Sequence, residues 1–347
     1  MATGQWPTIT DVASRTSTSG EIMEVAEMLS QCNDWTDDAP FMEANERTGH
    51  EFSYRTSIVS PAWRAYNQGT PYGKSTTAKA RVGLGMLADW SQVDAALLRH
   101  SGQGEAFRRS EDFAFLEGFS QVIAQTLIYG NTTLTPPEFM GLAPFYNTIN
   151  TNNAQNAANV LPGGGTGNSN TSLWYIGWSP RSFFLTYPRG GQAGLKVEDR
   201  SDTVPAYDNL GNPYLAFTTY FEQEVGLVPM DWRRAARLAN IDTTAAGLAG
   251  PNAIDIFATM PEMTLLFPKT SKKVSGVDKT DAPDDNYATR NVWYCNRTML
   301  HWMYVQAMRQ RNVLLRLEDY AGIVTDNFRG EPIKLIDQIL NTEATVN

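Results

Sequence analysis

The sequence predicts an α+β protein in which one long helix and several strand-rich segments occur without the regular βαβ alternation of parallel folds. Three observations carry this prediction. Residues 105–129 have the apolar spacing of a helix, residues 48–90 read as a long two-stranded hairpin, and residues 213–228 are rich in strand-forming side chains. The chain has 347 residues, 42% of them hydrophobic, which suits about two packing units.

The N-terminal segment, residues 1–45, is strongly acidic. It holds eight acidic residues against a single basic one, Arg15, and so carries most of the net charge of -9. Residues 19–31 predict a short amphipathic helix whose apolar stripe consists of Ile22, Val25, Ala26, Met28 and Leu29. A helix this short is marginal alone. We therefore expect the segment to dock on another surface, and its carboxylates suit an arginine-bearing surface of the same or a neighbouring chain.

Residues 48–90 predict a hairpin with a ragged tip. Residues 50–58 approach strand alternation, residues 75–93 form the return strand, and proline and glycine interrupt the sequence between them. The tip carries Trp63, Tyr66 and Tyr72. A two-stranded ribbon cannot build a core of its own, so these aromatic rings must find a surface elsewhere.

Residues 105–129 form the clearest predicted helix. Leu116, Phe119, Ile123 and Leu127 recur at steps of three and four residues and are expected to face inward. Gly130 and Asn131 give a suitable C-terminal stop. At 1.5 Å per residue the helix would be roughly 37 Å long.

The second half of the chain predicts mostly strands with two helices. Residues 147–171 have low complexity and read as a flexible loop or boundary, whereas the propensity of residues 231–242 favours a helix. The other predicted elements are a buried strand at 173–178, a turn at 208–212, a helix around 252–260, a polar loop at 269–286, a strand at 287–295, a helix at 298–311 with Met299, Trp302, Met303, Val305 and Met308 inward, and short strands after 313.

Composition excludes several classes of protein. Two cysteines, Cys32 and Cys295, and three histidines are too few for a disulfide framework or a cysteine-cluster metal site, and both thiols are expected to be free and buried. The negative charge argues against a dedicated nucleic-acid reader. No segment approaches the ~20 apolar residues of a membrane span, and the first residues predict no secretory signal.

Two glycine-rich motifs resemble nucleotide-binding loops only loosely. Residues 69–75 are one residue short of a phosphate loop and lack the preceding strand, so a hairpin tip is the better interpretation. Residues 83–88 match the dinucleotide fingerprint, but the segment before them does not read as a buried parallel strand.

No catalytic constellation emerges, so we predict no catalytic residue, cofactor site or metal site, and no enzyme. His301 reads as a structural histidine. Glu222 and Glu224 would share one strand face, which together with nine tryptophans permits a sugar site. A carbohydrate-binding or glycan-cleaving protein therefore stays open as an alternative. An N-terminal arm and a hairpin whose apolar residues have no local core are typical of an assembly subunit.

Short motifs along most of the chain resemble the major capsid proteins of tailed double-stranded DNA phages, closest to those of short-tailed phages. Each motif is short, and their order and spacing carry the resemblance. They are Thr48-Gly49-His50, residues 75–78, 106–108, 110–112 and 129–131, residues 139–142, 172–174, 187–190 and 194–195, residues 231–233, 240–242 and 296–298, and residues 328–333.

The resemblance implies the Hong Kong 97-type capsid fold. Its parts would be an N-terminal arm (1–45), an extended loop (46–92), a peripheral domain with a long spine helix (93–146), a mainly axial domain (147–311) and a return to the peripheral domain (312–347). It also makes 231–242 a strand, against the propensity.

The resemblance further implies a structural protein that self-assembles into hexamers and pentamers of an icosahedral head around packaged double-stranded DNA. Expected partners are other copies of the chain, a scaffolding protein, a portal and a decoration protein, with no membrane and no sequence-specific DNA contact. Localisation would be the virion, after assembly in the bacterial cytoplasm. The extended loop offers only Lys74 and Lys79 for an isopeptide cross-link of the kind some relatives form, and we expect none.

Overall fold

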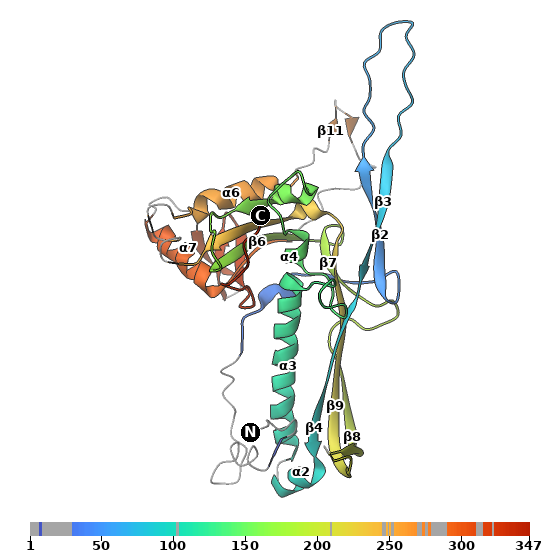
Figure 1. Cartoon of the computed structure of the whole chain (residues 1–347), viewed down its shortest axis with the longest axis vertical. Helices are drawn as coiled ribbons and strands as arrows, with labels where there is room; N and C mark the ends of the chain where they lie inside the picture. The colour runs from blue at the N-terminus through green and yellow to red at the C-terminus, as the bar shows by residue number, and fades with distance from the viewer. Residues whose placement is uncertain are drawn as a thin grey trace.

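The computed structural model describes residues 7–8, 30–101, 104–208, 210–244, 248, 250, 253–268, 273–274, 277–278, 290–309, 315–320 and 323–347. Almost all of the predicted helix at 19–31 and most of the polar loop at 269–286 lie outside these residues. The molecule consists of a compact body of sheet and helices, a long leg below it, and a thin hairpin that projects from it (Figure 1).

The leg is a long helix packed on a twisted antiparallel sheet. The helix is α3 (Gly104–Tyr129), and the sheet strands are β4 (Gly85–Asp94), β8 (Lys196–Tyr207) and β9 (Pro213–Pro229), with the short helix α2 (Ala95–Ser101) at the far end. Phe115 stacks on Phe221 of β9 with ring centroids 5.5 Å apart, and Phe119 packs beside it. This contact holds α3 along the sheet.

The predicted helix at 105–129 is confirmed as α3, with one correction to its buried face. Phe119, Ile123 and Leu127 are buried, but Leu116 is exposed. The reason is the change of surroundings along the helix. Its C-terminal half enters the body, where Leu127 and Ile128 are fully buried, whereas its N-terminal half contacts the sheet of the leg and α2, where Phe107 packs with Leu98.

The hairpin is confirmed, but its return strand is shorter than predicted. Strand β2 (Gly49–Ser57) pairs with β3 (Thr76–Gly83), and the chain then bends at Leu84 into β4, which pairs with β9 along its whole length. Gly85 allows the backbone of Phe139 to pack closely against the start of β4, because a Cβ atom there would lie 2.8 Å from the backbone nitrogen of Phe139. The single strand predicted over 75–93 is therefore two strands in two different sheets.

The body is built around one mixed sheet. Its central strand β6 (Asn170–Trp178) is buried along its whole length and pairs with β10 and β13 on its two sides. The other strands and short elements of the body are β1 (Phe41–Glu43), β5 (Val160–Pro162), β7 (Phe183–Tyr187), β10 (Ala235–Asp242), β13 (Arg290–Cys295), β14 (Leu315–Tyr320), β15 (Ile323–Phe328), β16 (Glu331–Leu335), α4 (Leu142–Phe145), η1 (Asp34–Asp37), η2 (Gln155–Asn159) and η3 (Trp232–Arg234). Strands β11 (Lys273–Val274) and β12 (Val277–Asp278) form a separate two-stranded sheet.

Two apolar cores lie on the two faces of this sheet. One contains Trp174, Tyr294 and Leu127 and receives the end of α3. The other contains Tyr175, Trp293 and Met260 and is covered by α6 (Ile256–Leu266) and α7 (Arg297–Arg309). The helices predicted around 252–260 and 298–311 are thus present. Helix α6 begins later than predicted because Asp255 caps it, and Met308, predicted to face inward, is exposed.

The helix favoured by propensity over 231–242 is wrong, and the strand implied by the resemblance is confirmed. Residues 235–241 form most of β10 and are all buried, because this strand lies between β5 and β6. Burial in the centre of a sheet overrides the intrinsic helix preference of alanine, arginine and leucine.

The flexible loop predicted over 147–171 is also wrong for much of its length. It contains η2 and β5, and Asn170 already belongs to β6. Gly163 and Gly165 donate backbone hydrogen bonds of 2.6 and 2.7 Å to the carbonyl oxygens of Ala239 and Asn240. A Cβ atom on either glycine would clash with these groups. The glycines that suggest flexibility serve close packing instead.

Candidate assembly interface

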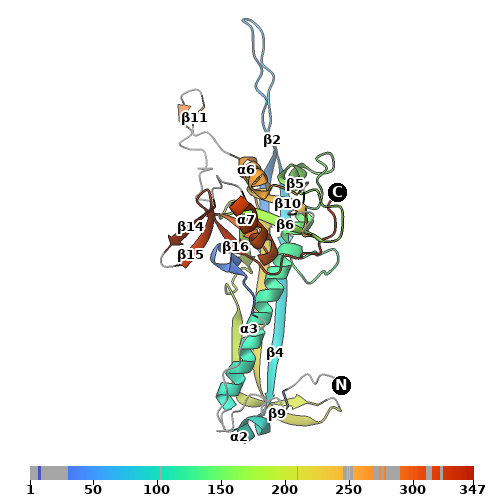
Figure 2. The ribbon, with the colours of Figure 1, turned by 90° about the vertical axis from the view of Figure 1, so that its left-hand side faces the viewer.

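The tip of the hairpin exposes three large aromatic side chains. Trp63, Tyr66 and Tyr72 have relative exposures of 104%, 97% and 106%. Ile58 is nearly as exposed, at 85%. Figures 1 and 2 show the tip well away from the body in both views. An apolar group of this size on a projecting limb indicates a contact with another molecule.

The root of the hairpin, in contrast, is firmly attached to the body. Phe52 of β2 and Val82 of β3 pack against Phe184 and Val228. The ring of His50 meets Phe184 edge to face at 5.5 Å, and burial lowers the pKa of this histidine. The hairpin is therefore a limb that is fixed at its root and whose aromatic tip is not buried by any described residue.

The hairpin is also basic in an acidic chain. Between Phe52 and Lys79 the sequence contains no acidic residue, and its charged side chains are Arg55, Arg64, Lys74 and Lys79. The whole chain has a net charge of -9. A basic limb is attracted to the acidic surface of another copy.

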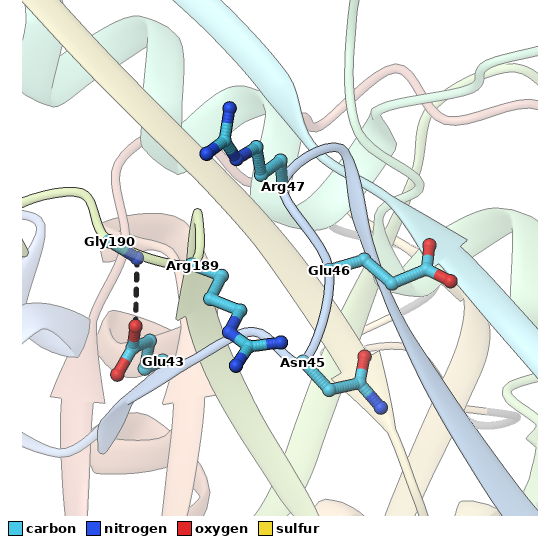
Figure 3. A pocket seen from close by; sticks show the side chains of 6 residues that line it. All are labelled: Glu43, Asn45, Glu46, Arg47, Arg189 and Gly190. Atoms are coloured by element: carbon cyan, nitrogen blue, oxygen red, sulfur yellow. Dashed lines mark hydrogen bonds between the residues drawn. The ribbon is translucent and has the colours of Figure 1, made fainter.

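A polar pocket of about 470 Å³ lies beside the root of the hairpin (Figure 3). It is formed where the loop between β1 and β2 meets the turn after β7, and its lining residues are Glu43, Asn45, Glu46, Arg47, Arg189 and Gly190. A second, more apolar groove of about 370 Å³ lies between β4 and α3 and includes Leu87, Phe115 and Val122.

A buried carboxylate joins the N-terminal segment to the body. The Asp38 carboxylate accepts hydrogen bonds from Lys334 Nζ at 3.0 Å and from the Tyr294 hydroxyl at 2.7 Å, and Arg290 Nη2 lies 2.7 Å away. Burial, together with the Asp38 charge, raises the pKa of Tyr294, so the phenol stays a hydrogen-bond donor. The contacts fix the chain where the N-terminal segment enters the body.

A second buried ion pair joins the C-terminal segment to the sheet. Arg237 Nη2 of β10 donates to Glu343 Oε2 at 2.9 Å, and both side chains are 4% exposed. Ser172 and Tyr129 donate hydroxyl hydrogen bonds to the same carboxylate. Burial and the neighbouring Glu343 raise the pKa of Tyr129. Nothing in the sequence pattern marks Asp38, Arg237 or Glu343 for these roles, because their partners lie far away in the chain.

The motifs weighed for chemistry are not brought together into a catalytic site. Residues 69–75 lie at the hairpin tip, as predicted, with no helix after them. Glu222 and Glu224 lie on the face of β9 away from α3, and neither borders the two pockets described above. Within the described part of the chain, no group of three or more metal-ligating side chains occurs, and no helix there has the length and apolar character needed to cross a membrane.

The remaining cysteine and histidine predictions are partly wrong. Both thiols are free, but only Cys295 is buried, whereas Cys32 is exposed. His301 is also exposed and contacts the ring of Trp302 at 5.6 Å. Cys32 lies at the surface, where its backbone exchanges two hydrogen bonds with Asp337.

Comparisons with known proteins give the family of this chain. A family model described as major capsid protein GP7 matches residues 17–347. A chain in the near-atomic cryo-EM structure of bacteriophage Epsilon15 is 31% identical, with a TM-score of 0.73 over 100% of this chain and 99% of that chain. The bacteriophage JBD30 capsid is 10% identical, with a TM-score of 0.43 over 91% and 95% of the two chains. A comparison with curated proteins gave no match.

Proposed function

The chain belongs to the GP7 family of major capsid proteins and has the Hong Kong 97-type fold of the shells of icosahedral phage heads, and we propose that it assembles as hexamers and pentamers in which the hairpin of each copy lies on a neighbouring copy. The observation that carries this proposal is the exposed aromatic tip. Trp63, Tyr66 and Tyr72 contact nothing in their own described chain that would bury them.

The binding energy available from the tip is large. A buried aromatic side chain removes roughly 150–250 Å² from water, which at ~25 cal/mol per Å² contributes roughly 4–6 kcal/mol per ring. The ordering of the tip and of the two molecules offsets part of this energy. The four basic residues of the hairpin add attraction to acidic neighbours and favour correct encounters.

The parts of the subunit can each be assigned to one part of the capsid fold. We assign residues 1–45 to the arm and the hairpin to the extended loop, with the leg as peripheral domain and most of the body as axial domain. Strands β4 and β8 both pair with β9 in the leg. We therefore assign residues 85–92 and 196–228 to the peripheral domain, in place of the loop and the axial domain.

The finer parts of the function follow from chemistry. An acidic shell encloses double-stranded DNA without binding it tightly, because phosphates and carboxylates repel each other. From its family we propose as partners other copies of the chain, a scaffolding protein, a portal and a decoration protein, with assembly in the cytoplasm of the bacterial host. The comparisons lend no support to a carbohydrate-binding or glycan-cleaving protein.

The test is a triple substitution at the tip, Trp63→Ala with Tyr66→Ala and Tyr72→Ala. The subunit should fold with an unchanged melting temperature, because the three side chains are fully exposed in the described part of the chain. Shell formation, followed by sedimentation velocity and negative-stain microscopy with the scaffolding protein present, should be lost.

The matched control keeps the rings, with Phe at all three positions. It should form shells, because the apolar area is nearly the same. Normal shells from the alanine variant, or loss of its fold, would contradict the proposed role of the tip.

A further inference from the structure

The pocket at the hairpin root holds two arginines whose side chains have no partner among the described residues, while its other polar groups are engaged (Figure 3). Glu43 Oε1 accepts a hydrogen bond from Gly190 N at 2.8 Å, and Glu46 Oε2 accepts one from Arg81 Nε at 2.9 Å. The Asn45 amide bonds the backbone of Glu51 through both its oxygen and its nitrogen. Arg47 and Arg189 thus leave the pocket able to attract an anion.

The backbone beneath the two arginines is held in place by hydrogen bonds. Ala44 N donates to Tyr187 O at 2.8 Å, and Arg189 N donates to Glu46 O at 3.3 Å, so the two loops are tied to each other. Gly190, with a φ of 77°, makes the turn that Gly191 closes by bonding Pro188 O. A site on fixed backbone loses less entropy when it binds, and the guanidinium fork matches a carboxylate.

We propose that this Arg47–Arg189 pocket binds carboxylates from the acidic N-terminal segment of a neighbouring copy, an inference that rests on the proposed shell assembly. Residues 1–29 carry Asp11, Glu21, Glu24 and Glu27 against the single basic residue Arg15. In the helix that the sequence predicts over 19–31, the three-residue spacing of the glutamates places successive carboxylates next to each other. They form a row of charge that two arginines can share.

A neighbouring copy fits the geometry better than the same copy. The N-terminal segment leaves the described chain beside α3, where Gln31 N donates to Glu117 Oε1 at 2.9 Å and Gln31 Oε1 accepts from Gln338 at 2.5 Å. Figure 1 shows this point on the opposite side of the molecule from the start of β2. To reach its own pocket the segment would have to turn back across the body.

The experiment measures how fast proteinase K removes the N-terminal segment from assembled, DNA-free shells of the full chain, read by mass spectrometry. In wild-type shells the segment should be protected. In Arg47→Glu/Arg189→Glu shells its cleavage should be at least tenfold faster. Adding Glu21→Lys, Glu24→Lys and Glu27→Lys to that variant should restore protection, and Arg47→Lys/Arg189→Lys should give an intermediate rate.

Each other outcome is informative. If the charge-reversed pocket prevents shell formation, its recovery in the swapped variant supports the proposal, and no recovery overturns it. Equal cleavage of wild-type and charge-reversed shells also overturns it. Protection of the N-terminal segment that appears only in DNA-filled heads would overturn it as well, because the anion in the pocket would then be DNA phosphate and not a carboxylate of that segment. Absence of shells from the wild-type chain would instead contradict the proposed function and, with it, this inference.

Discussion

At the residue scale, the buried pair of Arg237 and Glu343 is more consequential than the exposed ion pairs. Besides Glu343, Arg237 donates to Ser172 Oγ at 3.0 Å and to Tyr146 O at 2.8 Å, and its guanidinium lies 5.0 Å from the centre of the Trp174 ring. Each polar atom of the guanidinium therefore has an acceptor. The charge is tolerated inside the protein only while these partners remain.

Replacing Glu343 with Leu should destabilise the subunit by about 3–5 kcal/mol, because an uncompensated guanidinium is left buried. Urea unfolding measures the change. The control is Glu105→Leu, which breaks the ion pair of Arg109 Nη2 and Glu105 Oε2, 3.9 Å apart, where both side chains are solvent-exposed. It should cost about 1 kcal/mol or less. Equal losses in the two variants would contradict the distinction.

The two thiols should differ in reactivity. Burial raises the pKa of Cys295 to about 12, so almost no thiolate exists at pH 8, and the side chain is also inaccessible. Cys32 is exposed. The folded protein should therefore react with one equivalent of Ellman's reagent, and the unfolded protein with two. Folded Cys32→Ser should not react, and a rapid reaction of that variant would show that Cys295 is accessible.

At the element scale, local sequence patterns predict the elements but not all their surroundings. The spacing of apolar residues finds α3 within one residue at its start, since the pattern depends only on helix geometry. It misplaces Leu116 and Met308 because it cannot show which part of a helix has neighbours. The helix propensity of residues 231–242 fails for the same reason, because pairing with β5 and β6 makes β10 a strand.

The candidate interface was predictable only in part. The hairpin and its aromatic tip follow from the sequence, because a ribbon without a core must seek a partner. The Arg47–Arg189 pocket does not, since its two arginines come together only when β1 pairs with β7. Ordinary charged residues far apart in sequence give no pattern that marks such a site.

Two phenylalanines on α3 test how that helix is held. Phe119 is buried at 6% exposure against Phe221, whereas Phe113 is 62% exposed. Phe119→Asp should prevent stable folding, because a buried unpaired carboxylate costs several kcal/mol. Phe113→Asp should leave the melting temperature within a few degrees of wild type. Circular dichroism with thermal melting distinguishes the two, and a stable Phe119→Asp subunit would contradict the packing of α3 on the leg.

At the scale of the whole molecule, the C-terminal segment joins parts that are distant in sequence. Glu343 bonds β10 and α3 through Arg237 and Tyr129. Val346 exchanges two hydrogen bonds with the Asn240 side chain, and Asn347 O accepts from Ile149 N at 3.1 Å. The last seven residues thus clamp the top of the leg onto the central sheet.

Removing residues 341–347 should therefore destabilise the subunit in two ways. The truncation removes packing, and it leaves the Arg237 guanidinium without Glu343. The truncation should destabilise the subunit by at least the 3–5 kcal/mol of an orphaned buried charge. In an Arg237→Met background the same truncation should cost about 1–3 kcal/mol less, because no charge is left unpaired and coupled residues are not additive. Urea unfolding of the four proteins in this cycle gives the coupling energy. Strictly additive losses would mean that the clamp stabilises the molecule by packing alone, and that Arg237 does not depend on the C-terminal segment.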